Sequence, residues 1–355
     1  MTDHNPPPLL EVRNLKTQFF LNQGVVRAVD GASFTLRAGE TLGVVGESGC
    51  GKSVMSRSLL RLVSPPGRIV EGEILYTPRA APDRPIDLAQ LDPKGAQIRS
   101  IRGAEISMVF QEPMTSLSPV HSIGNQIIEA IVLHQDDDQV TARAKAVEML
   151  RRVGMPRPEA TIDRYPHQLS GGMRQRAMIA MALSCHPRIL IADEPTTALD
   201  VTTQAQILTL MRRLQSDLGT AIIFITHDLG VIAQMTQHVI VMYLGKVVES
   251  ASVDTIFYEP LHPYTHALLH SIPRLGRRME TGKSRLSTIR GSVPDPSAMP
   301  SGCPFHTRCP FSDRARCVSE TPAYREIAPG HHVSCHYAEQ IDYARSPFAQ
   351  AARTS

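Results

Sequence analysis

Apolar and polar residues alternate in two runs near the N-terminus, at residues 9–20 and 25–36. The tripeptide Asn22-Gln23-Gly24 lies between them, and its composition is typical of a turn. The pattern therefore predicts an antiparallel β-hairpin. A short apolar run at residues 40–46 then predicts a strand, and helical spacing of apolar residues predicts a helix over residues 52–63.

The middle of the chain alternates between buried strands and helices. Short apolar runs predict strands at residues 105–111, 189–193, 221–226 and 238–242. Residues 77–93 contain four prolines and predict a surface loop, and residues 120–176 predict helices with breaks at 154–158 and 165–166. Strands alternating with helices indicate a parallel sheet covered on both faces, so the predicted fold class is α/β.

The composition is that of a globular protein without a strong charge bias. With 355 residues and 42% hydrophobic composition, the chain is long enough for one large domain and a smaller one. A net charge of +3 does not predict a nucleic-acid or lipid partner. No apolar run approaches the roughly 18 residues of a membrane span, and residues 1–8 lack a signal-peptide pattern. We therefore expect a cytosolic chain that reaches a membrane only through a partner.

The run Gly46-Glu47-Ser48-Gly49-Cys50-Gly51-Lys52-Ser53 matches the phosphate-loop pattern in full. It lies between a predicted strand and a predicted helix, which is the context that this motif requires. Glycines let successive N–H groups point at phosphate oxygens, and the helix N-terminus adds partial positive charge. We expect Lys52 to reach the β- and γ-phosphates of ATP and Ser53 to bind Mg²⁺. A chance glycine-rich turn is the alternative, and the flanking elements disfavour it.

Two acidic residues, Asp193 and Glu194, end the apolar run at residues 189–193. Burying two carboxylates at a strand end is costly unless a cation lies nearby. We expect Asp193 to hold Mg²⁺ through water and Glu194 to polarise the attacking water. The alternative is that both carboxylates only cap the following helix.

The run Leu169-Ser170-Gly171-Gly172 opens a predicted helix and forms a second anion-binding terminus. One nucleotide bound to one chain has no evident use for it, whereas two chains placed head to tail do. This motif is the signature of the ABC ATPases, and the chain resembles that family over residues 9 to about 340. Each chain of such a dimer presents Ser170, Gly171 and Gly172 to the γ-phosphate held by its partner.

The resemblance implies roles for further residues. Gln111 matches the glutamine that contacts Mg²⁺ and water and senses the transmembrane subunit, and His227 matches the histidine that contacts the γ-phosphate. Asp200 lies in the loop that links the two nucleotide sites. Phe19, or its neighbour Phe20, lies where the family places an aromatic that stacks on adenine.

The implied architecture is an ABC-type P-loop ATPase domain at residues 1–252. It has an antiparallel β subdomain and a helical signature subdomain at about 115–180. A small Cys-rich domain follows at 253–340, with a tail at 341–355. The boundary also fits the composition, since Pro, His and Arg become frequent past about residue 250.

Several local runs resemble the ATPase subunits of dipeptide and oligopeptide importers. They include the segment after Phe110, the segment around the signature motif and Gly302-Cys303-Pro304-Phe305-His306-Thr307-Arg308-Cys309-Pro310. The resemblance implies a second related ATPase subunit in a heterodimer, two transmembrane permease subunits and an extracytoplasmic solute-binding protein. It also implies a peripheral position on the cytoplasmic face of the inner membrane. Di- or oligopeptides are the expected solute, with nickel chelates or glutathione as alternatives.

Other classes of function are disfavoured. An ABC ATPase acting on ribosomes or DNA usually has two cassettes or a coiled-coil insertion, and this chain has one cassette, no heptad run and no basic stripe. Arg174 and Arg176 lie on one predicted helix without aromatic neighbours, so we expect no nucleic-acid partner. A module that binds ATP without cleaving it is disfavoured because Glu194 and His227 are both present.

Four of the six cysteines gather near the C-terminus, at Cys303, Cys309, Cys317 and Cys335. A reducing cytosol disfavours disulfides. Zinc sites favour shorter spacings than C-x5-C-x7-C-x17-C, whereas iron–sulfur clusters accept irregular ones. Importer ATPases with a matching tail carry a [4Fe-4S] cluster, and the resemblance implies one here, with Zn²⁺ or no metal as alternatives. Because the phosphate loop lies in the other predicted domain, Cys309→Ser is expected to spare ATP binding.

Overall fold

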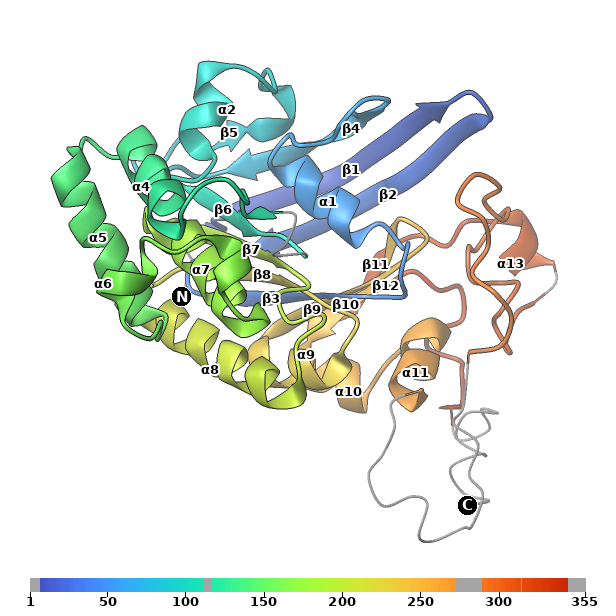
Figure 1. The fold of residues 1–355 in the computed structure, drawn as a ribbon. Helices are drawn as coiled ribbons and strands as arrows, with labels where there is room; N and C mark the ends of the chain where they lie inside the picture. The colour runs from blue at the N-terminus through green and yellow to red at the C-terminus, as the bar shows by residue number, and fades with distance from the viewer. Residues whose placement is uncertain (1–6, 112–115, 272–288, 314, 344–355) are drawn as a thin grey trace, which may run out of the picture.

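The computed structural model describes residues 7–111, 116–271, 289–313 and 315–343 (Figure 1). A four-stranded antiparallel sheet has the order β2-β1-β4-β5. Its strands are β1 (Leu10–Leu21), β2 (Gly24–Leu36), β4 (Gly67–Tyr76) and β5 (Ile86–Asp87). The predicted hairpin is confirmed, since Leu21 pairs with Gly24 at the end of β1 and β2. Strand β4 was not predicted, and β5 interrupts the expected surface loop.

The second sheet has eight strands in the order β11-β12-β10-β9-β3-β8-β7-β6. The five strands from β9 to β6 are parallel, and β10, β11 and β12 are antiparallel to their neighbours. The strands are β3 (Thr41–Val45), β6 (Ile106–Val109), β7 (Ile189–Asp193), β8 (Ala221–Ile225), β9 (His238–Tyr243), β10 (Lys246–Ser252), β11 (Arg325–Ala328) and β12 (His331–Val333). The predicted parallel sheet is therefore confirmed for five strands. The antiparallel strands β10, β11 and β12, which extend this sheet, were not predicted.

Helices lie on both faces of this sheet (Figure 1). The helical arm predicted at about 115–180 contains α4 (Ile123–His134), α5 (Gln139–Arg152), α6 (Pro158–Thr161) and α7 (Gly171–Leu183). The other helices are α1 (Lys52–Leu59), α2 (Ala96–Ile101), α8 (Val201–Leu218), α9 (Leu229–Met235), α10 (Val253–Tyr258), α11 (Pro263–His270) and α13 (Arg316–Ser319). Among the described residues, no helix is long and apolar enough to cross a bilayer.

The large sheet is buried on both faces. Along β7, Leu190 and Ala192 join the core formed with the helical arm, whereas Ile189 and Ile191 join the core that contains α1 and the antiparallel sheet. Alternate side chains of a strand point to opposite faces, so a strand between two cores is apolar at every position. This explains why the central strands were predictable as uninterrupted apolar runs.

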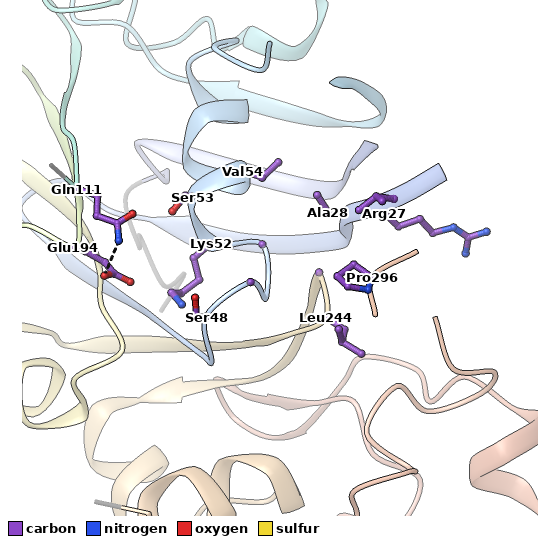
Figure 2. A pocket seen from close by; sticks show the side chains of 14 residues that line it. Arg27, Ala28, Ser48, Lys52, Ser53, Val54, Gln111, Glu194, Leu244 and Pro296 are labelled. Carbon is purple, nitrogen blue, oxygen red and sulfur yellow. Dashed lines mark hydrogen bonds between the residues drawn. The ribbon is translucent and has the colours of Figure 1, made fainter. Parts of the chain in front are cut away.

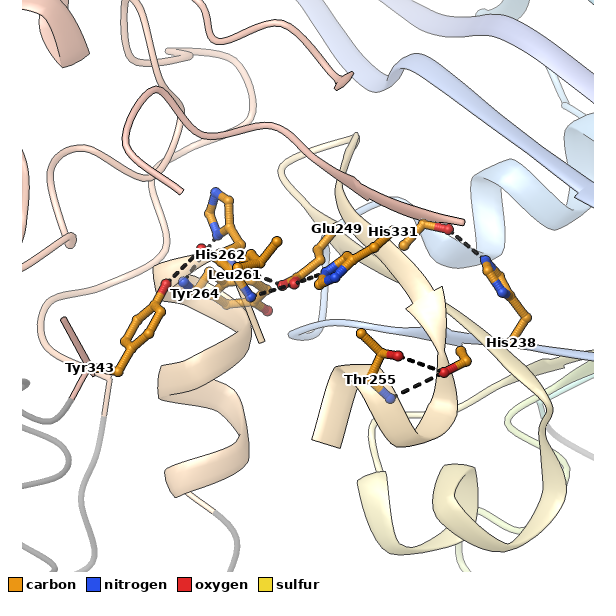
Figure 3. A network of polar contacts seen from close by, with 10 residues as sticks. His238, Glu249, Thr255, Leu261, His262, Tyr264, His331 and Tyr343 are labelled. Atoms are coloured by element: carbon orange, nitrogen blue, oxygen red, sulfur yellow. Dashed lines mark hydrogen bonds and ion pairs between the residues drawn. The ribbon is translucent and has the colours of Figure 1, made fainter. Parts of the chain in front are cut away.

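The region after residue 252 shares the large sheet, because β12 pairs with β10. Glu249 of β10 is fully buried and ties this region to the sheet (Figure 3). Its carboxylate accepts hydrogen bonds from the N–H groups of Leu261 (2.6 Å) and His262 (3.0 Å) and lies 2.8 Å from Nε2 of His331. Burial lowers the pKa of His262 to about 4, so its neutral Nδ1 can accept from the N–H of Tyr264.

Replacing Glu249 by Ala should therefore loosen the C-terminal region. The change leaves buried donors unpaired, so we expect the free energy of unfolding to fall by about 3 kcal/mol in urea denaturation. The exposed Glu259 offers a control, and Glu259→Ala should stay within about 0.5 kcal/mol of wild type. Equal effects of the two substitutions would contradict the anchoring role of Glu249.

Candidate active site

The loop of residues 46–51 connects β3 to α1 and fits closely between two other segments. Gly46 has φ 153° and Gly51 has φ 102°. A Cβ on Gly46 would lie 2.2 Å from the carbonyl oxygen of Met242, and one on Gly51 would lie 2.1 Å from that of Ala28. Both positions therefore require glycine for backbone conformation and for space.

The loop is followed by two polar side chains at the start of α1. Lys52 is only 5% exposed, and its Nζ donates to the carbonyl oxygens of Gly46 (2.8 Å) and Glu47 (3.2 Å). Ser53 Oγ donates to Oδ1 of Asp193 at 3.2 Å. Burial raises the pKa of Asp193, with the neighbouring Glu194 adding to it. A carboxylate so desolvated, next to a hydroxyl, is a fitting partner for a divalent cation.

Glu194 follows Asp193 and lies where three polar side chains meet. Its carboxylate accepts from Nε2 of Gln111 (3.2 Å) and Oγ1 of Thr197 (2.9 Å), and it lies 3.4 Å from Nδ1 of His227. The Glu194 backbone has φ 48°, which is unusual for a residue with a side chain. Such strain is concentrated at functional sites.

Lys52, Ser53, Gln111 and Glu194 line one cavity, shown in Figure 2. Asp193 and His227 are not among its lining residues, but they contact the lining residues Ser53 and Glu194. Gln111 and Glu194 lie at one end, and Lys52 and Ser53 lie between that end and the other. The far end has an apolar wall that the sequence did not predict, formed by Val26, Ala28, Leu244 and Pro296 together with Arg27. These residues come from three segments that lie far apart in the sequence, namely β2, the turn after β9 and the C-terminal region. No local motif could therefore mark them.

The predicted adenine-stacking residue lies next to this wall. Phe19 pairs with Val26 across β1 and β2, so both side chains point from the same face of the sheet. Phe19 is nevertheless not among the lining residues, and its ring packs over Gly67, where a Cβ would come within 2.5 Å. The alternative, Phe20, is 38% exposed and has Arg68 over its ring at 4.3 Å.

The signature residues lie outside the lining of this cavity. Ser170 caps α7 by accepting from the N–H of Met173, and Asp200 caps α8 by accepting from the N–H of Thr203. A Cβ on Gly172 would lie 2.8 Å from Cγ2 of Thr203, so the two helix starts are in contact. Ser170, Gly171 and Asp200 are exposed, which leaves this surface open to a second chain.

The two arginines after the signature glycines hold the arm together. Arg174 Nε donates to the carbonyl oxygen of Pro166 (2.7 Å), and Arg176 donates to that of Val153 (2.6 Å) and to Oε1 of Gln206 (3.2 Å). These contacts give both side chains a structural role within the chain.

The four C-terminal cysteines line one small cavity together with aromatic and histidine side chains. Burial raises the pKa of three of the thiols, to about 11 for Cys303 and Cys335 and about 12 for Cys309. Within the described ranges, no three His, Cys, Asp or Glu side chains are placed to hold a single metal ion. The four cysteines therefore lie around one cavity. Among the described residues, they do not form a site for a single metal ion.

Comparisons with known proteins decide the family. A model described as ABC transporter matches residues 29–197, and one described as oligopeptide/dipeptide transporter, C-terminal region, matches residues 248–317. Over 333 residues the chain is 49% identical to the oligopeptide transport ATP-binding protein AppD of Bacillus subtilis, covering 94% of this chain and 97% of the relative. The chain belongs to the ABC transporter ATP-binding proteins. This confirms the resemblance drawn from the motifs.

Further members of the family are similar over nearly the whole chain. The chain is 50% identical to y4tR of Sinorhizobium fredii (94% of this chain, 96% of the relative) and 44% identical to the dipeptide transport ATP-binding protein DppD of Escherichia coli (93% and 96%). Among solved structures, it resembles the dimeric ATP-binding cassette MJ0796 in a post-hydrolysis state with ADP and Pi. That likeness has a TM-score of 0.60 and 26% identity, covering 69% of this chain and 98% of the cassette.

Proposed function

We propose that this chain is the ATP-binding and ATP-hydrolysing subunit of an ABC importer of di- or oligopeptides. The observation that carries the proposal is that one cavity joins the phosphate loop, Gln111 and Glu194. The similarity to AppD and DppD, named for oligopeptide and dipeptide transport, favours peptides over nickel chelates or glutathione as the solute. It also disfavours a soluble ABC ATPase without a transport role.

We propose a task with Mg-ATP for the polar residues in and beside this cavity. Backbone N–H groups of residues 46–53 would hold the phosphates, with Lys52 neutralising the β- and γ-phosphates. Ser53 and Asp193, already hydrogen-bonded, would hold Mg²⁺, with Asp193 acting through water. Glu194 would polarise the attacking water, and Gln111 and His227, both against its carboxylate, would orient that water and contact the γ-phosphate.

The exposed signature surface supports a two-chain site. Ser170, Gly171 and Gly172 would complete the γ-phosphate site of a partner chain, and Asp200 would link the two sites. The likeness to a dimeric cassette supports this arrangement. We propose a second, related ATPase as the partner, forming a heterodimer.

The remaining partners follow from the family. Two transmembrane permeases and an extracytoplasmic solute-binding protein would complete the importer, with this chain on the cytoplasmic face of the inner membrane. The loop after Gln111 would meet a permease, although residues 112–115 lie outside the described residues. We assign residues 1–252 to the ATPase domain and 253–340 to a C-terminal region that shares its sheet, with residues 341–355 as a tail that is described only to residue 343.

We further propose that Cys303, Cys309, Cys317 and Cys335 hold a [4Fe-4S] cluster. Their position around one cavity supports a four-thiolate group. Their spacing along the chain is longer than the short spacings that zinc sites favour, whereas iron–sulfur clusters accept irregular spacings. When bound, it would stabilise a region with little regular secondary structure.

Glu194→Gln tests the proposed chemistry. The substitution removes the negative charge and preserves the shape, so ATP should bind normally while hydrolysis by the assembled transporter falls about a hundredfold or more. Lys52→Ala is the contrast, since it should lose ATP binding itself. ATPase assays and equilibrium nucleotide binding check both outcomes, and turnover of Glu194→Gln close to wild type would exclude the assigned role.

The cluster proposal predicts the metal content of the protein. Anaerobically purified protein should be brown, absorb broadly at about 400 nm and contain about four irons per chain. Cys309→Ser should lose most of this iron, whereas Cys185→Ser, at an isolated cysteine, should keep it. Colourless protein with one zinc per chain would refute the cluster.

A further inference from the structure

The C-terminal region touches the phosphate loop directly. Arg308 is 6% exposed, and its guanidinium holds both carboxylate oxygens of Glu47, with N–O distances of 2.6 and 3.0 Å. Glu47 is the second residue of the phosphate loop, 261 positions earlier in the chain. Such a two-point contact fixes both the position and the orientation of the carboxylate.

A second contact holds the backbone of the same loop residue. The N–H of Glu47 donates to the hydroxyl oxygen of Tyr264 at 2.8 Å. Tyr264 is fully buried, and its ring packs against those of Tyr243 (4.7 Å between centroids) and Phe305 (5.4 Å). The C-terminal region thus determines where the side chain and the amide of Glu47 lie.

These contacts extend to the phosphate-binding lysine. The carbonyl oxygen of Glu47 accepts from Nζ of Lys52 at 3.2 Å, so Arg308, Glu47 and Lys52 form a continuous polar chain. Arg308 also balances the charge of a carboxylate that would otherwise be unpaired beside a site for phosphates. A displaced Glu47 would change both the shape of the loop and its electrostatic potential.

The same region also contributes to the wall of the nucleotide cavity. Pro296 lines it at the same end as Leu244 and Arg27 (Figure 2). Arg308 Nε donates to the carbonyl oxygen of Arg290 at 3.1 Å, which links the segment that precedes Pro296 to the Glu47 contact. One arginine therefore connects two borders of the cavity.

We propose that Arg308 is a positioning residue for ATP, acting through Glu47, and that the C-terminal region completes the nucleotide site of its own chain. The inference rests on the proposed function, in which this cavity binds Mg-ATP. The expectation that Cys309→Ser spares ATP binding assumed that the phosphate loop lies in another domain, whereas here the two regions are in direct contact. Cys309 is the next residue after Arg308.

The test compares Arg308→Met with Arg308→Lys in the assembled transporter. Arg308→Met should raise the KM for ATP and the Kd for Mg-ATP about tenfold, with kcat at saturating ATP within about twofold of wild type. Arg308→Lys retains the charge and should recover a substantial part of the affinity. Both substitutions remove the same ion pair. The double variant Arg308→Met with Glu47→Gln should therefore have a Kd for Mg-ATP no higher than that of the single variant with the higher Kd.

The matched control is another two-point ion pair of the same region. Arg325 forms a two-point ion pair with Glu339, with N–O distances of 2.9 and 2.7 Å, but both side chains are exposed and neither lines the cavity. Arg325→Met should leave Kd and KM unchanged. If Arg308→Met does not fold, Glu47→Gln carries the same expectation of a weaker Kd.

The outcomes separate this inference from the proposed function. A variant at Arg308 or Glu47 that lowers the melting temperature but binds Mg-ATP as tightly as wild type would overturn the inference, since the contact would then only anchor the region. Wild-type protein that binds no Mg-ATP would instead overturn the proposed function.

Discussion

The phosphate loop packs tightly between backbone atoms of β9 on one side and of β2 on the other. The two sheets therefore meet at this loop. Gly46 lies against the end of β9, and Gly51 lies against Ala28 of β2. Next to these contacts, the carbonyl oxygen of Cys50 accepts from the N–H of Gly245, whose own carbonyl accepts from Asp30 of β2. The loop therefore fixes how the antiparallel sheet lies on the parallel one. Glu194, which follows β7, and the wall residues of β2 line the same cavity because of this junction.

Local patterns were sufficient for the five parallel strands and insufficient for β4 of the smaller sheet and for β12. Strands β7 and β8 lie between two cores, so every position of β8 and every position of β7 before Asp193 is apolar, and the run is visible in the sequence. Only two of the ten positions of β4 are buried, and the strand carries charged residues, so it lacks such a run. Strand β12 has only three residues, and it is held by pairing with β10 about 80 positions away. Pairing over such distances leaves no local signal.

Some residues of the candidate site could be predicted from local motifs, and others could not. Motifs specified Lys52, Ser53, Asp193 and Glu194, and the structure brings Gln111 and His227 to the Glu194 carboxylate as well. The apolar wall carried no motif, because apolar contact with a flat base requires shape more than particular residue types. The pair of Arg308 and Glu47 was equally hidden, since each is an ordinary charged residue until the fold brings them together. The signature residues were predicted, and Ser170, Gly171 and Asp200 are exposed at the starts of α7 and α8, where the proposed second chain would reach them.

Vanadate photocleavage of the assembled transporter tests the two-chain site most directly. Vanadate trapped with Mg-ADP occupies the position of the γ-phosphate, and ultraviolet light then cleaves the backbone at residues in contact with it. A sandwich of two chains predicts cleavage of this chain both within residues 46–53 and at Ser170, because each ATPase contributes to both nucleotides. If this chain is cleaved only within its phosphate loop and remains intact at Ser170, the two-chain site is contradicted.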